Sequence, residues 1–347
     1  MRHLLAALTV AIAMSFSAAW PAAAQGDAAD PMASALEAYR AGRYEQALLV
    51  AAPLAEKGNV QAQLMLGSIY NNGEGVASNP EMASRWFAKA AAQGDASAQY
   101  ALGMLMEYGG VEGADPAVAR KSFRDAAEQG HIAAQTELGL MYTAGRGGAQ
   151  DLNEAANWFE RAAAKGNADA QYYLGTLYAA GKGKPRDLGE AARHFRLAAD
   201  QGQPQAAYQL GLMLQDGVGM EKDLPQATKR FQQAAQKGVS GAQTSLGFAY
   251  LGGDGVEKNE TLAAKWFVEA AMRGDALAQD RLARLYFLGQ GVTRDIAAAL
   301  LWLTLAERNG MTDDTLRSAM EPEITPEIRA QVEAEIEKLE KANAAAN

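Results

Sequence analysis

Apolar residues along most of this chain fall into short stripes that have the spacing of amphipathic helices. Ala62, Leu66, Ile69 and Tyr70 recur at i, i+4, i+7 and i+8, the spacing that places side chains on one face of a helix. A second stripe of this kind occupies residues 83–90. Glycines lie between the two stripes, so this stretch predicts two helices joined by a turn.

The two stripes return every 36 residues from Gly58 to Asn309, without an insertion. A fixed period of this length is typical of repeat proteins in which each unit is one supersecondary element. The chain is therefore predicted to hold seven helical hairpins. The leucines of the first stripe and the large apolar residues of the second that keep this period are Leu66, Leu102, Leu138, Leu174, Leu210, Leu246, Leu282, Phe87, Phe123, Phe159, Phe195, Phe231, Phe267 and Leu303.

Glycine follows the same period at four places in the unit, which together hold 27 of the 35 glycines. Gly73 and Gly75 are predicted to end the first helix, because glycine readily takes the left-handed conformation that closes a helix. Gly67 lies inside that helix, where the missing side chain predicts a close approach by the neighbouring helix. The second helix is predicted to begin at an Asn or Asp cap. These caps are Asn79, Asp115, Asp151, Asp187, Asp223, Asn259 and Asp295.

The repeated motifs read Ala-Gln-x-x-Leu-Gly-x-x-Tyr at Ala62–Tyr70, Gly-x-Gly-Val at Gly73–Val76 and Trp-Phe-x-x-Ala-Ala at Trp86–Ala91. These motifs resemble those of the Sel-1-like repeat family, a branch of the tetratricopeptide superfamily. The resemblance covers residues 58–310 and implies an all-α fold, a right-handed solenoid of αα-hairpins. Local departures from the motifs are Ala207 in place of Gln, Ser122, His194 and Arg230 in place of Trp, and an irregular turn at Gly109–Gly113.

The repeats predict the domain organisation of the chain. Residues 1–24 are a signal peptide, 25–57 an N-terminal capping hairpin that resembles a tetratricopeptide unit, 58–310 the solenoid and 311–347 an acidic C-terminal cap. Caps are expected because the exposed ends of a solenoid must be covered. The seven predicted units are 58–93, 94–129, 130–165, 166–201, 202–237, 238–273 and 274–309.

Each cap is predicted to be helical. The N-terminal cap should form helices at Ala33–Ala41 and Tyr44–Glu56. In the C-terminal cap, Thr325 precedes a proline and is predicted to cap a last helix, in which glutamates alternate with lysines as on a solvated face. Asp313 and Asp314 are interpreted as part of a linker before this helix.

The first residues of the chain have the pattern of a secretory signal. Arg2 precedes an apolar run from Leu4 to Trp20, and small residues at 22–24 predict cleavage after Ala24. The alternative is an uncleaved anchor, but the run is shorter than the roughly 20 residues that a membrane-spanning helix needs. The absence of cysteine favours a Gram-negative periplasm over a eukaryotic secretory route. The protein is therefore expected to be periplasmic or secreted, with no transmembrane segment after cleavage.

Composition argues against most catalytic and nucleic-acid-binding functions. The chain has no cysteine, three histidines and a net charge of −9, which disfavour thiolate chemistry, a histidine-rich metal site and a phosphate-binding face. His194 takes a core position and His131 lies in a turn between units, so neither is expected to act as a base. The Gly-x-Gly turns follow helices rather than strands, which disfavours a phosphate loop. We expect no catalytic residue, no cofactor and no metal, and the chain is not expected to be an enzyme.

The tryptophans Trp86, Trp158, Trp266 and Trp302 share one position of the repeat. Packing in the core is the expected role of this position, and a stacking platform for sugars or bases is the alternative.

The outward positions of the first helices, which are residues 64, 68 and 71 and their equivalents, are rich in aromatic and aliphatic side chains. The resemblance implies that these helices line the concave side of the solenoid and hold an extended or helical peptide. The alternative is that tight curvature buries the same residues against neighbouring units. The candidate partner-binding residues are Tyr100, Met104, Tyr172, Tyr208, Leu212, Phe248, Leu251 and Phe287.

The sequence thus predicts an exported, non-catalytic scaffold or adaptor for protein–protein interactions. The resemblance implies a role in a bacterial envelope process, such as signalling or the exopolysaccharide or cell-wall machinery. The expected partner is a protein or peptide, including the periplasmic part of a membrane protein, and not nucleic acid. Two alternatives are a cell-wall or polysaccharide binding protein with a hydrolytic accessory role, and a secreted, host-directed interaction factor.

Overall fold

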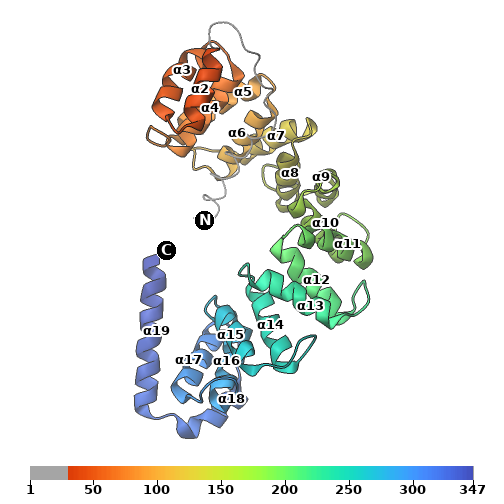
Figure 1. Cartoon of the computed structure of the whole chain (residues 1–347), viewed down its shortest axis with the longest axis vertical. Coiled ribbons are helices and arrows are strands. Elements are labelled where there is room, and N and C mark those ends of the chain that lie inside the picture. The colour runs from red at the N-terminus through yellow and green to blue at the C-terminus, as the bar shows by residue number, and fades with distance from the viewer. Residues whose placement is uncertain (1–29, 347) are drawn as a thin grey trace. The chain divides into compact units, whose positions relative to one another are not determined.

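The computed structural model describes residues 30–346, which form helices joined by short turns (Figure 1). Within this range there is no β-strand, and each repeat holds one pair of helices. The paired helices are α4 (Val60–Asn72), α5 (Pro80–Ala92), α6 (Ala96–Tyr108), α7 (Pro116–Glu128), α8 (Ile132–Ala144), α9 (Leu152–Ala164), α10 (Ala168–Ala180), α11 (Leu188–Asp200), α12 (Pro204–Asp216), α13 (Leu224–Ala235), α14 (Ser240–Gly252), α15 (Glu260–Ala271), α16 (Ala276–Leu288) and α17 (Ile296–Arg308). The predicted all-α repeat fold is confirmed, while the predicted signal peptide lies outside the described residues.

The chain divides into two compact units. Within residues 30–346, unit 1 extends to Ala170 and includes Lys182–Pro185, and unit 2 comprises Gln171–Gly181 and the residues from Arg186 onward. In unit 1 each helix from α4 to α9 packs on the next, and in unit 2 the same holds from α11 to α17. This consecutive packing buries the apolar stripe of each helix against its neighbours in the chain.

The N-terminal cap is the helical hairpin that the sequence predicts. Helices α2 (Pro31–Arg40) and α3 (Tyr44–Glu56) pack on each other and turn at Gly42, where φ is 72°. Helix α3 then packs on α4, the first helix of the repeats. The apolar side of the first repeat is therefore covered by this hairpin.

The C-terminal cap consists of α18 (Asp314–Met320), the 3₁₀ turn η1 (Glu321–Glu323) and α19 (Pro326–Ala346). Helix α19 packs on α17, and its buried residues Val332 and Ile336 join the core of the last repeat. Glu327, Glu333 and Glu337 of α19 are exposed. The predicted acidic cap is thus amphipathic, and its apolar face covers the end of the repeats.

One detail of this prediction is wrong: Asp313 and Asp314 do not form a linker. Asp313 is the N-cap of α18, and its Oδ1 accepts a hydrogen bond from the backbone N–H of Leu316 at 2.9 Å. Asp314 is the first residue of that helix. The helix has only seven residues, which is too short for the apolar period to reveal it in the sequence.

The predicted helix ends are observed. All seven Asn and Asp residues that were expected to cap second helices accept a hydrogen bond from the first turn, as Asp151 does from the N–H groups of Asn153 and Glu154 at 3.0 and 3.1 Å. Helix α8 ends at Gly145 in the left-handed conformation, with φ of 68°. Gly109 departs from this geometry with φ of −87°, in the turn that the sequence marks as irregular.

A phenylalanine ring from the second helix lies directly on the glycine inside the first helix. A Cβ atom added to Gly139 would lie 2.5 Å from Cε1 of Phe159, which is closer than real side chains approach. The last repeat differs at both positions, since Ala283 stands for the glycine and Leu303 for the phenylalanine, and both are buried. In this repeat the first helix has a Cβ where the others have none, and the second helix has a smaller side chain in place of the ring. The same glycine–phenylalanine contact joins Gly67 to Phe87, Gly103 to Phe123, Gly175 to Phe195, Gly211 to Phe231 and Gly247 to Phe267.

The glutamine of the repeated motif connects one repeat to the next. Its side-chain amide donates to a backbone carbonyl eight residues earlier, as Gln135 Nε2 does to the carbonyl oxygen of Ala127 at 3.1 Å. That carbonyl belongs to the last turn of the preceding second helix, where carbonyl groups lack partners within the helix. The same bond joins Gln63 to Ala55, Gln99 to Ala91, Gln243 to Ala235 and Gln279 to Ala271.

The fifth repeat has Ala207 at this position and satisfies the same carbonyl in another way. Gln233, on α13, donates from Nε2 to the carbonyl oxygen of Ala199 at 2.6 Å. Ala199 is the residue to which a glutamine at position 207 would bond, eight residues earlier. A side chain on the second helix therefore replaces the missing one on the first.

We predict that Gly139→Ala destabilises the protein and that Phe159→Leu rescues it. The added Cβ should cost about 1–3 kcal/mol of overpacking, because it meets the ring. Phe159→Leu alone should also destabilise by leaving a cavity, whereas the double variant reproduces the Ala283–Leu303 pair. Chemical denaturation of the four proteins gives the coupling energy, expected to be at least about 1 kcal/mol in favour of the double variant. Additive effects would mean that the two side chains are not in contact.

A second prediction concerns the replacement of the glutamine bond in the fifth repeat. Gln233→Ala should lower the free energy of unfolding by about 0.5–1.5 kcal/mol, because the Ala199 carbonyl loses its side-chain donor and keeps only backbone N–H partners such as that of Gly202. Adding Ala207→Gln should restore most of this loss. Gln232→Ala, at the adjacent exposed residue, is the matched control and should have little effect. Failure of Ala207→Gln to rescue would contradict the equivalence of the two bonds.

Candidate interaction face

The eight candidate residues all lie on first helices, but their exposure differs between the two units. In unit 1, Tyr100 and Met104 on α6 are buried, with 9% and 8% of their surface exposed. In unit 2, Tyr172, Tyr208, Leu212, Phe248, Leu251 and Phe287 are half-buried and pack against the cores beneath them. Burial by neighbouring helices, the alternative considered for these positions, therefore applies to the two candidates of unit 1.

Tyr100 is buried because rings surround it. Its ring stacks on His131 with centroids 4.6 Å apart and lies 5.8 Å from the ring of Phe123. His131 is the N-cap of α8, where Nδ1 accepts a hydrogen bond from the Ala134 N–H at 3.2 Å. Burial lowers the pKa of His131, which favours the neutral ring that this bond requires. His131 thus has a structural role at a helix end.

A charged network on α6 and α8 was not foreseen from the sequence. Arg146 Nη1 lies 2.5 Å from Glu107 Oε1, and Arg146 Nη2 donates to the Tyr108 hydroxyl at 3.1 Å. The hydroxyl in turn donates to Glu137 Oε2 at 3.1 Å. The Glu107 side chain is only 5% exposed, so this part of the first-helix surface of unit 1 contains charges held within the protein.

Burial controls the protonation of this network. It raises the pKa of Glu137, and the negative charge of Glu107 adds to the effect, while Tyr108 and Arg146 oppose it. Burial and the adjacent Glu137 carboxylate raise the pKa of Tyr108 to about 12, so its hydroxyl stays protonated and can donate. Burial thus shifts the equilibrium of Glu137 toward its protonated form, against the opposing effect of Tyr108 and Arg146.

In unit 2 the corresponding positions carry apolar side chains with accessible surface. Phe248 packs edge-on against the core ring of Phe267, with centroids 5.2 Å apart. Phe287 packs on the last core, and the next residue, Leu288 at the end of α16, is 63% exposed. We call Phe248 and Leu251 on α14, with Phe287 and Leu288 on the next first helix α16, the apolar row.

Arginines border this row. The guanidinium of Arg281 lies 5.6 Å from the ring of Phe248, and that of Arg294 lies 5.5 Å from the ring of Phe287. Arg284 lies between them in sequence and bonds to Asp313, the cap of α18. Arg281 is likewise paired with Asp280 and Arg294 with Glu323, so the borders of the row consist of ion pairs.

Asp280 is a buried carboxylate at one of the outward positions. Its Oδ2 lies 3.7 Å from Arg281 Nη1 and 3.9 Å from Arg284 Nε. Burial raises the pKa of Asp280, against the effect of the two arginines, and the neighbouring Asp313 adds to the rise. Asp280 thus lies beneath the face as a buried group and does not add to its accessible surface.

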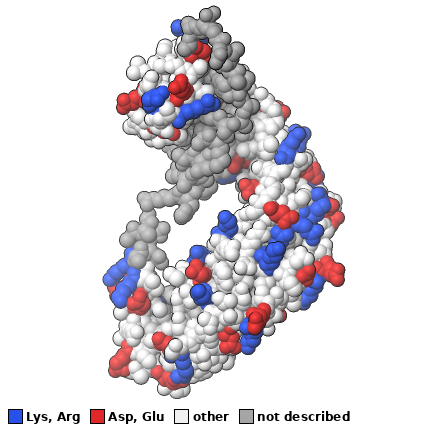
Figure 2. Space-filling model, in the orientation of Figure 1, with Lys and Arg blue, Asp and Glu red and all other residues white. Residues whose placement is uncertain are grey.

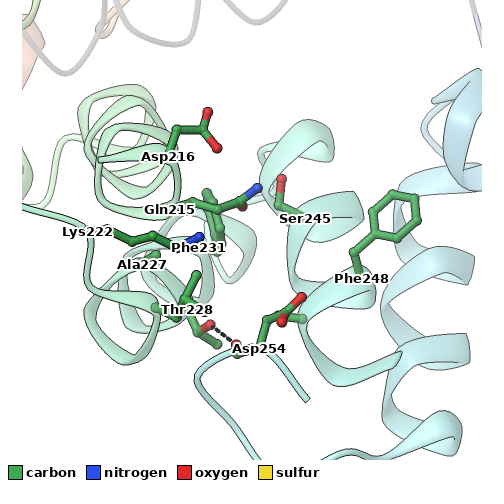
Figure 3. A pocket seen from close by; sticks show the side chains of 11 residues that line it. Gln215, Asp216, Lys222, Ala227, Thr228, Phe231, Ser245, Phe248 and Asp254 are labelled. Atoms are coloured by element: carbon green, nitrogen blue, oxygen red, sulfur yellow. Dashed lines mark hydrogen bonds between the residues drawn. The ribbon is translucent and has the colours of Figure 1, made fainter. Parts of the chain in front are cut away.

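A cavity of about 260 Å³ opens between α12, α13 and α14 (Figure 3). Figure 3 shows Gln215 and Asp216 from α12 opposite Ser245 from α14, with Asp254 below them. The Thr228 hydroxyl donates to the backbone carbonyl of Asp254 at 2.8 Å, which closes the base of the cavity. Both polar and apolar side chains line the cavity, and Phe248 of the apolar row is one of them.

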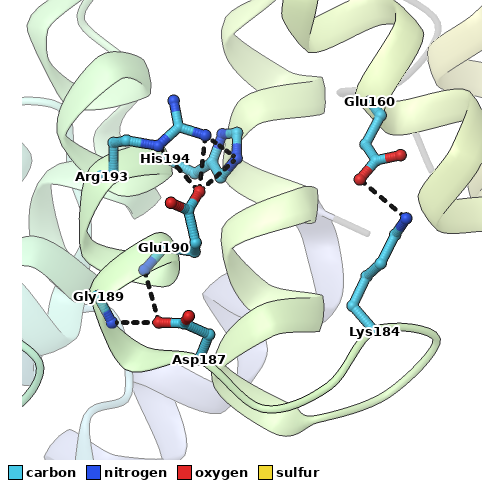
Figure 4. A network of polar contacts seen from close by, with 7 residues as sticks. All are labelled: Glu160, Lys184, Asp187, Gly189, Glu190, Arg193 and His194. Atoms are coloured by element: carbon cyan, nitrogen blue, oxygen red, sulfur yellow. Dashed lines mark hydrogen bonds and ion pairs between the residues drawn. The ribbon is translucent and has the colours of Figure 1, made fainter.

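His194 occupies the tryptophan position of the fourth repeat, as the sequence predicts, and is buried (Figure 4). Its ring stacks on Tyr178 with centroids 5.7 Å apart. Nε2 lies 2.9 Å from Arg193 Nη2 and must accept, because a guanidinium only donates. Arg193 is also bonded to Glu190 at 2.7 Å. These contacts assign His194 a packing role.

The tryptophans differ in burial. Trp86 and Trp158 are buried, which confirms the expected core packing for these two, and Lys89 and Arg161 lie over their rings at 3.8 and 4.4 Å. Trp266 and Trp302 are only half-buried. The second pair therefore retains accessible indole surface.

Charges are dispersed over the molecule. Figure 2 shows basic and acidic side chains interspersed across the described part of the visible surface. Among residues 30–346, no group of three or more His, Asp or Glu side chains is arranged to hold a metal ion. None of the helices described has both the length and the apolar character needed to cross a bilayer.

Comparison with known proteins finds similar solved structures. A crystal structure of a Sel1 repeat protein from Oxalobacter formigenes aligns with 88% of this chain and 98% of that chain, at 29% identity and a TM-score of 0.68. The c5321 protective antigen of uropathogenic Escherichia coli aligns at 26% identity over 95% of this chain and 90% of its own, with a TM-score of 0.44. No curated protein gave a significant match. The Sel1 repeat model matches residues 60–95, 96–131, 132–167, 168–203, 204–239, 240–275 and 276–311.

We predict that Glu137→Gln stabilises the protein at neutral pH. Because the pKa of Glu137 is raised on folding, the folded state binds a proton more tightly than the unfolded state. The stability contributed by this group is present below the ordinary carboxyl pKa and is lost as pH rises through the raised value. Glutamine is neutral throughout, so the melting temperature should rise by a few degrees at pH 7 and change little at pH 4.

Glu128→Gln on the exposed side of α7 is the matched control for this charge removal. It should leave the melting temperature nearly unchanged at both pH values. A lower melting temperature for Glu137→Gln at pH 7 would show instead that Arg146 and Tyr108 stabilise the ionised carboxylate.

Proposed function

The chain belongs to the Sel1 repeat family, whose members generally act as scaffolds for protein–protein interactions, and we propose that it is an exported adaptor in a bacterial envelope process. The family is typically non-catalytic, and the adaptor is proposed to be non-catalytic as well. Export is proposed from the signal pattern at residues 1–24. Envelope signalling and the exopolysaccharide or cell-wall machinery are the processes that this localisation would serve.

The observation that carries the proposal is the apolar row of unit 2. Phe248, Leu251, Phe287 and Leu288 present apolar surface on two consecutive first helices, and Leu288 is 63% exposed. Large side chains of this kind are costly to leave in water and mark interaction sites when they are contiguous. The row is carried by helices that the buried repeats hold in place, so a partner would meet a preformed surface.

The borders of the row indicate what the partner presents. Arg281 and Arg294 lie beside the aromatic rings, with about a third and a half of their side chains exposed. Both arginines already pair with carboxylates of the chain, Asp280 and Glu323, so a segment with apolar side chains flanked by uncharged polar groups would complement this arrangement. We propose such a segment of a protein partner, for example the periplasmic part of a membrane protein.

Two other functions have weaker support. A cell-wall or polysaccharide binding role would use the accessible indole surfaces of Trp266 and Trp302, which are half-buried. A secreted, host-directed interaction factor would use the same apolar row, so the surface alone does not separate it from an envelope adaptor. The apolar row favours a protein partner because rings there lie among aliphatic side chains.

We predict that Leu288→Asp reduces partner binding about tenfold or more, in line with the loss of an interface hot spot. The measurement is recovery of photo-crosslinked partner from periplasmic extract, with a crosslinking amino acid at position 251. The melting temperature should be unchanged, because Leu288 is mostly exposed.

Met272→Asp is the matched control, since Met272 is 74% exposed but lies at the end of the second helix α15. It should leave crosslinking at wild-type level. Equal loss in both variants, or unchanged recovery with Leu288→Asp, would exclude the apolar row as the binding surface. Absence of the mature chain from the periplasm would contradict the proposed export.

A further inference from the structure

The cavity between α12, α13 and α14 lies at the same positions of the repeat as the charged network of unit 1. In that network Glu107 and Tyr108 end one first helix, Glu137 lies on the next first helix, and Arg146 lies in the turn after it. Three repeats later, the residues at these four positions line the cavity (Figure 3). They are Gln215, Asp216, Ser245 and Asp254.

A guanidinium of the chain itself fills these positions in unit 1. Arg146 reaches Glu107 at 2.5 Å and the Tyr108 hydroxyl at 3.1 Å. In unit 2 a carboxylate, that of Asp254, stands at the arginine position, and Asp216 replaces the larger tyrosine. The cavity of about 260 Å³ therefore takes the place that the guanidinium has in unit 1.

The polar side chains of the lining are available to a ligand. Within residues 30–346, none of the side chains of Gln215, Asp216, Lys222, Ser245 and Asp254 forms a hydrogen bond or an ion pair. These residues are also accessible, since the three charged ones are exposed and the other two are half-buried. A ligand that enters the cavity can thus bond to them without displacing a contact of the protein.

The charge of the lining selects the class of ligand. Asp216 and Asp254 contribute two carboxylates and Lys222 one ammonium, so the net charge is −1. No other pair of neighbouring repeats in residues 58–309 has an acid at these four positions without a base. A cation is therefore the favoured ligand, because the position that supplies the positive charge in unit 1 here supplies a negative one.

The arrangement of the acceptors favours a guanidinium over other cations. They come from the end of α12, from α14 and from the turn after α14, and so surround the cavity on several sides. A guanidinium has five N–H donors in a planar fork, whereas an ammonium is a compact charge with three. The half-buried ring of Phe248 also lines the cavity, and guanidinium planes stack on rings. The volume is below the roughly 300 Å³ of the smallest drug-sized sites, which suits the end of one side chain.

We propose that this cavity binds the guanidinium of an arginine side chain from a partner polypeptide. The group takes the place that Arg146 has in unit 1, donates to the carboxylates of Asp216 and Asp254, and packs on Phe248. Because Phe248 also belongs to the apolar row, the arginine would lie beside the apolar segment of the same partner. The identity of the partner as a polypeptide rests on the proposed adaptor function, whereas recognition of a guanidinium can be tested without it.

The test titrates the purified protein with N-acetyl-arginine N′-methylamide while NMR follows the Gln215 side-chain amide and the Ser245 backbone N–H. We expect saturable shifts with a dissociation constant in the millimolar range, as is usual for a single small side chain. N-acetyl-citrulline N′-methylamide has a neutral urea of nearly the same shape and should bind about tenfold more weakly. N-acetyl-lysine N′-methylamide has the charge without the planar fork and should bind several-fold more weakly.

Three variants test the role of the charges. Asp254→Asn should weaken binding of the arginine probe about tenfold, because it removes a charged acceptor. Glu257→Gln is the matched control, since Glu257 is an exposed acid of the same turn that does not line the cavity, and it should leave binding unchanged. Lys222→Ala should strengthen binding several-fold, because it removes the one base of the lining.

Three results would overturn the proposal. The first is the absence of saturable shifts with the arginine probe. The second is equally tight binding of the citrulline or the lysine probe, since the site would then not recognise a guanidinium. The third is weaker binding in Lys222→Ala, which would make the cavity an anion site. Leu288→Asp should bind the arginine probe normally, so failure of this site and failure of the apolar row give different results.

Discussion

A phenylalanine ring lying on the backbone of a glycine sets the distance between the two helices of a repeat. With no Cβ at Gly139, the ring of Phe159 occupies the space that a side chain of the first helix would otherwise fill. Close approach of this kind increases dispersion contacts along both helices and fixes their register. The last repeat shows that the constraint is one of volume, because Ala283 is matched by the smaller Leu303. Everything that the repeats present to a partner depends on this spacing.

The connection between repeats depends on a hydrogen bond to a backbone carbonyl at the end of the second helix. It does not depend on which residue donates that bond. Carbonyl groups in the last turn of a helix need partners from outside the helix, and burial makes an unsatisfied one costly. A backbone N–H of the following turn bonds to each such carbonyl, and the motif glutamine adds a side-chain donor in most repeats, as Gln233 does where Ala207 cannot. Substitution at the motif position is therefore tolerated when another side chain reaches the same oxygen.

Much of the fold could be predicted because its signals are local and repeated. The caps at Asp151 and its equivalents and the left-handed glycines such as Gly145 depend on a few neighbouring residues, so their spacing is visible in the chain. Helix α18 could not be predicted, since seven residues carry no clear apolar period. The exposure of individual side chains could not be predicted either. Whether Tyr100 is buried depends on His131 and Phe123, which come from other parts of the fold.

The buried polar contacts could be predicted only in part. They are also the contacts in which one repeat differs chemically from the next. Glutamine or asparagine recurs at positions 93, 129, 201 and 309, a periodic signal that could have been found before the structure, although only the geometry shows what it bonds. Because the repeats place each position in a similar environment, a departure from the pattern has a defined consequence. Arg273 stands where four other repeats have such a carboxamide, and Gln243 Oε1 there has no hydrogen-bond partner among the described residues, whereas Glu107, Glu137 and Arg146 form a charged network in unit 1. The repeats share one backbone conformation, and the few residues that depart from the repeated pattern therefore give individual repeats their own polar contacts.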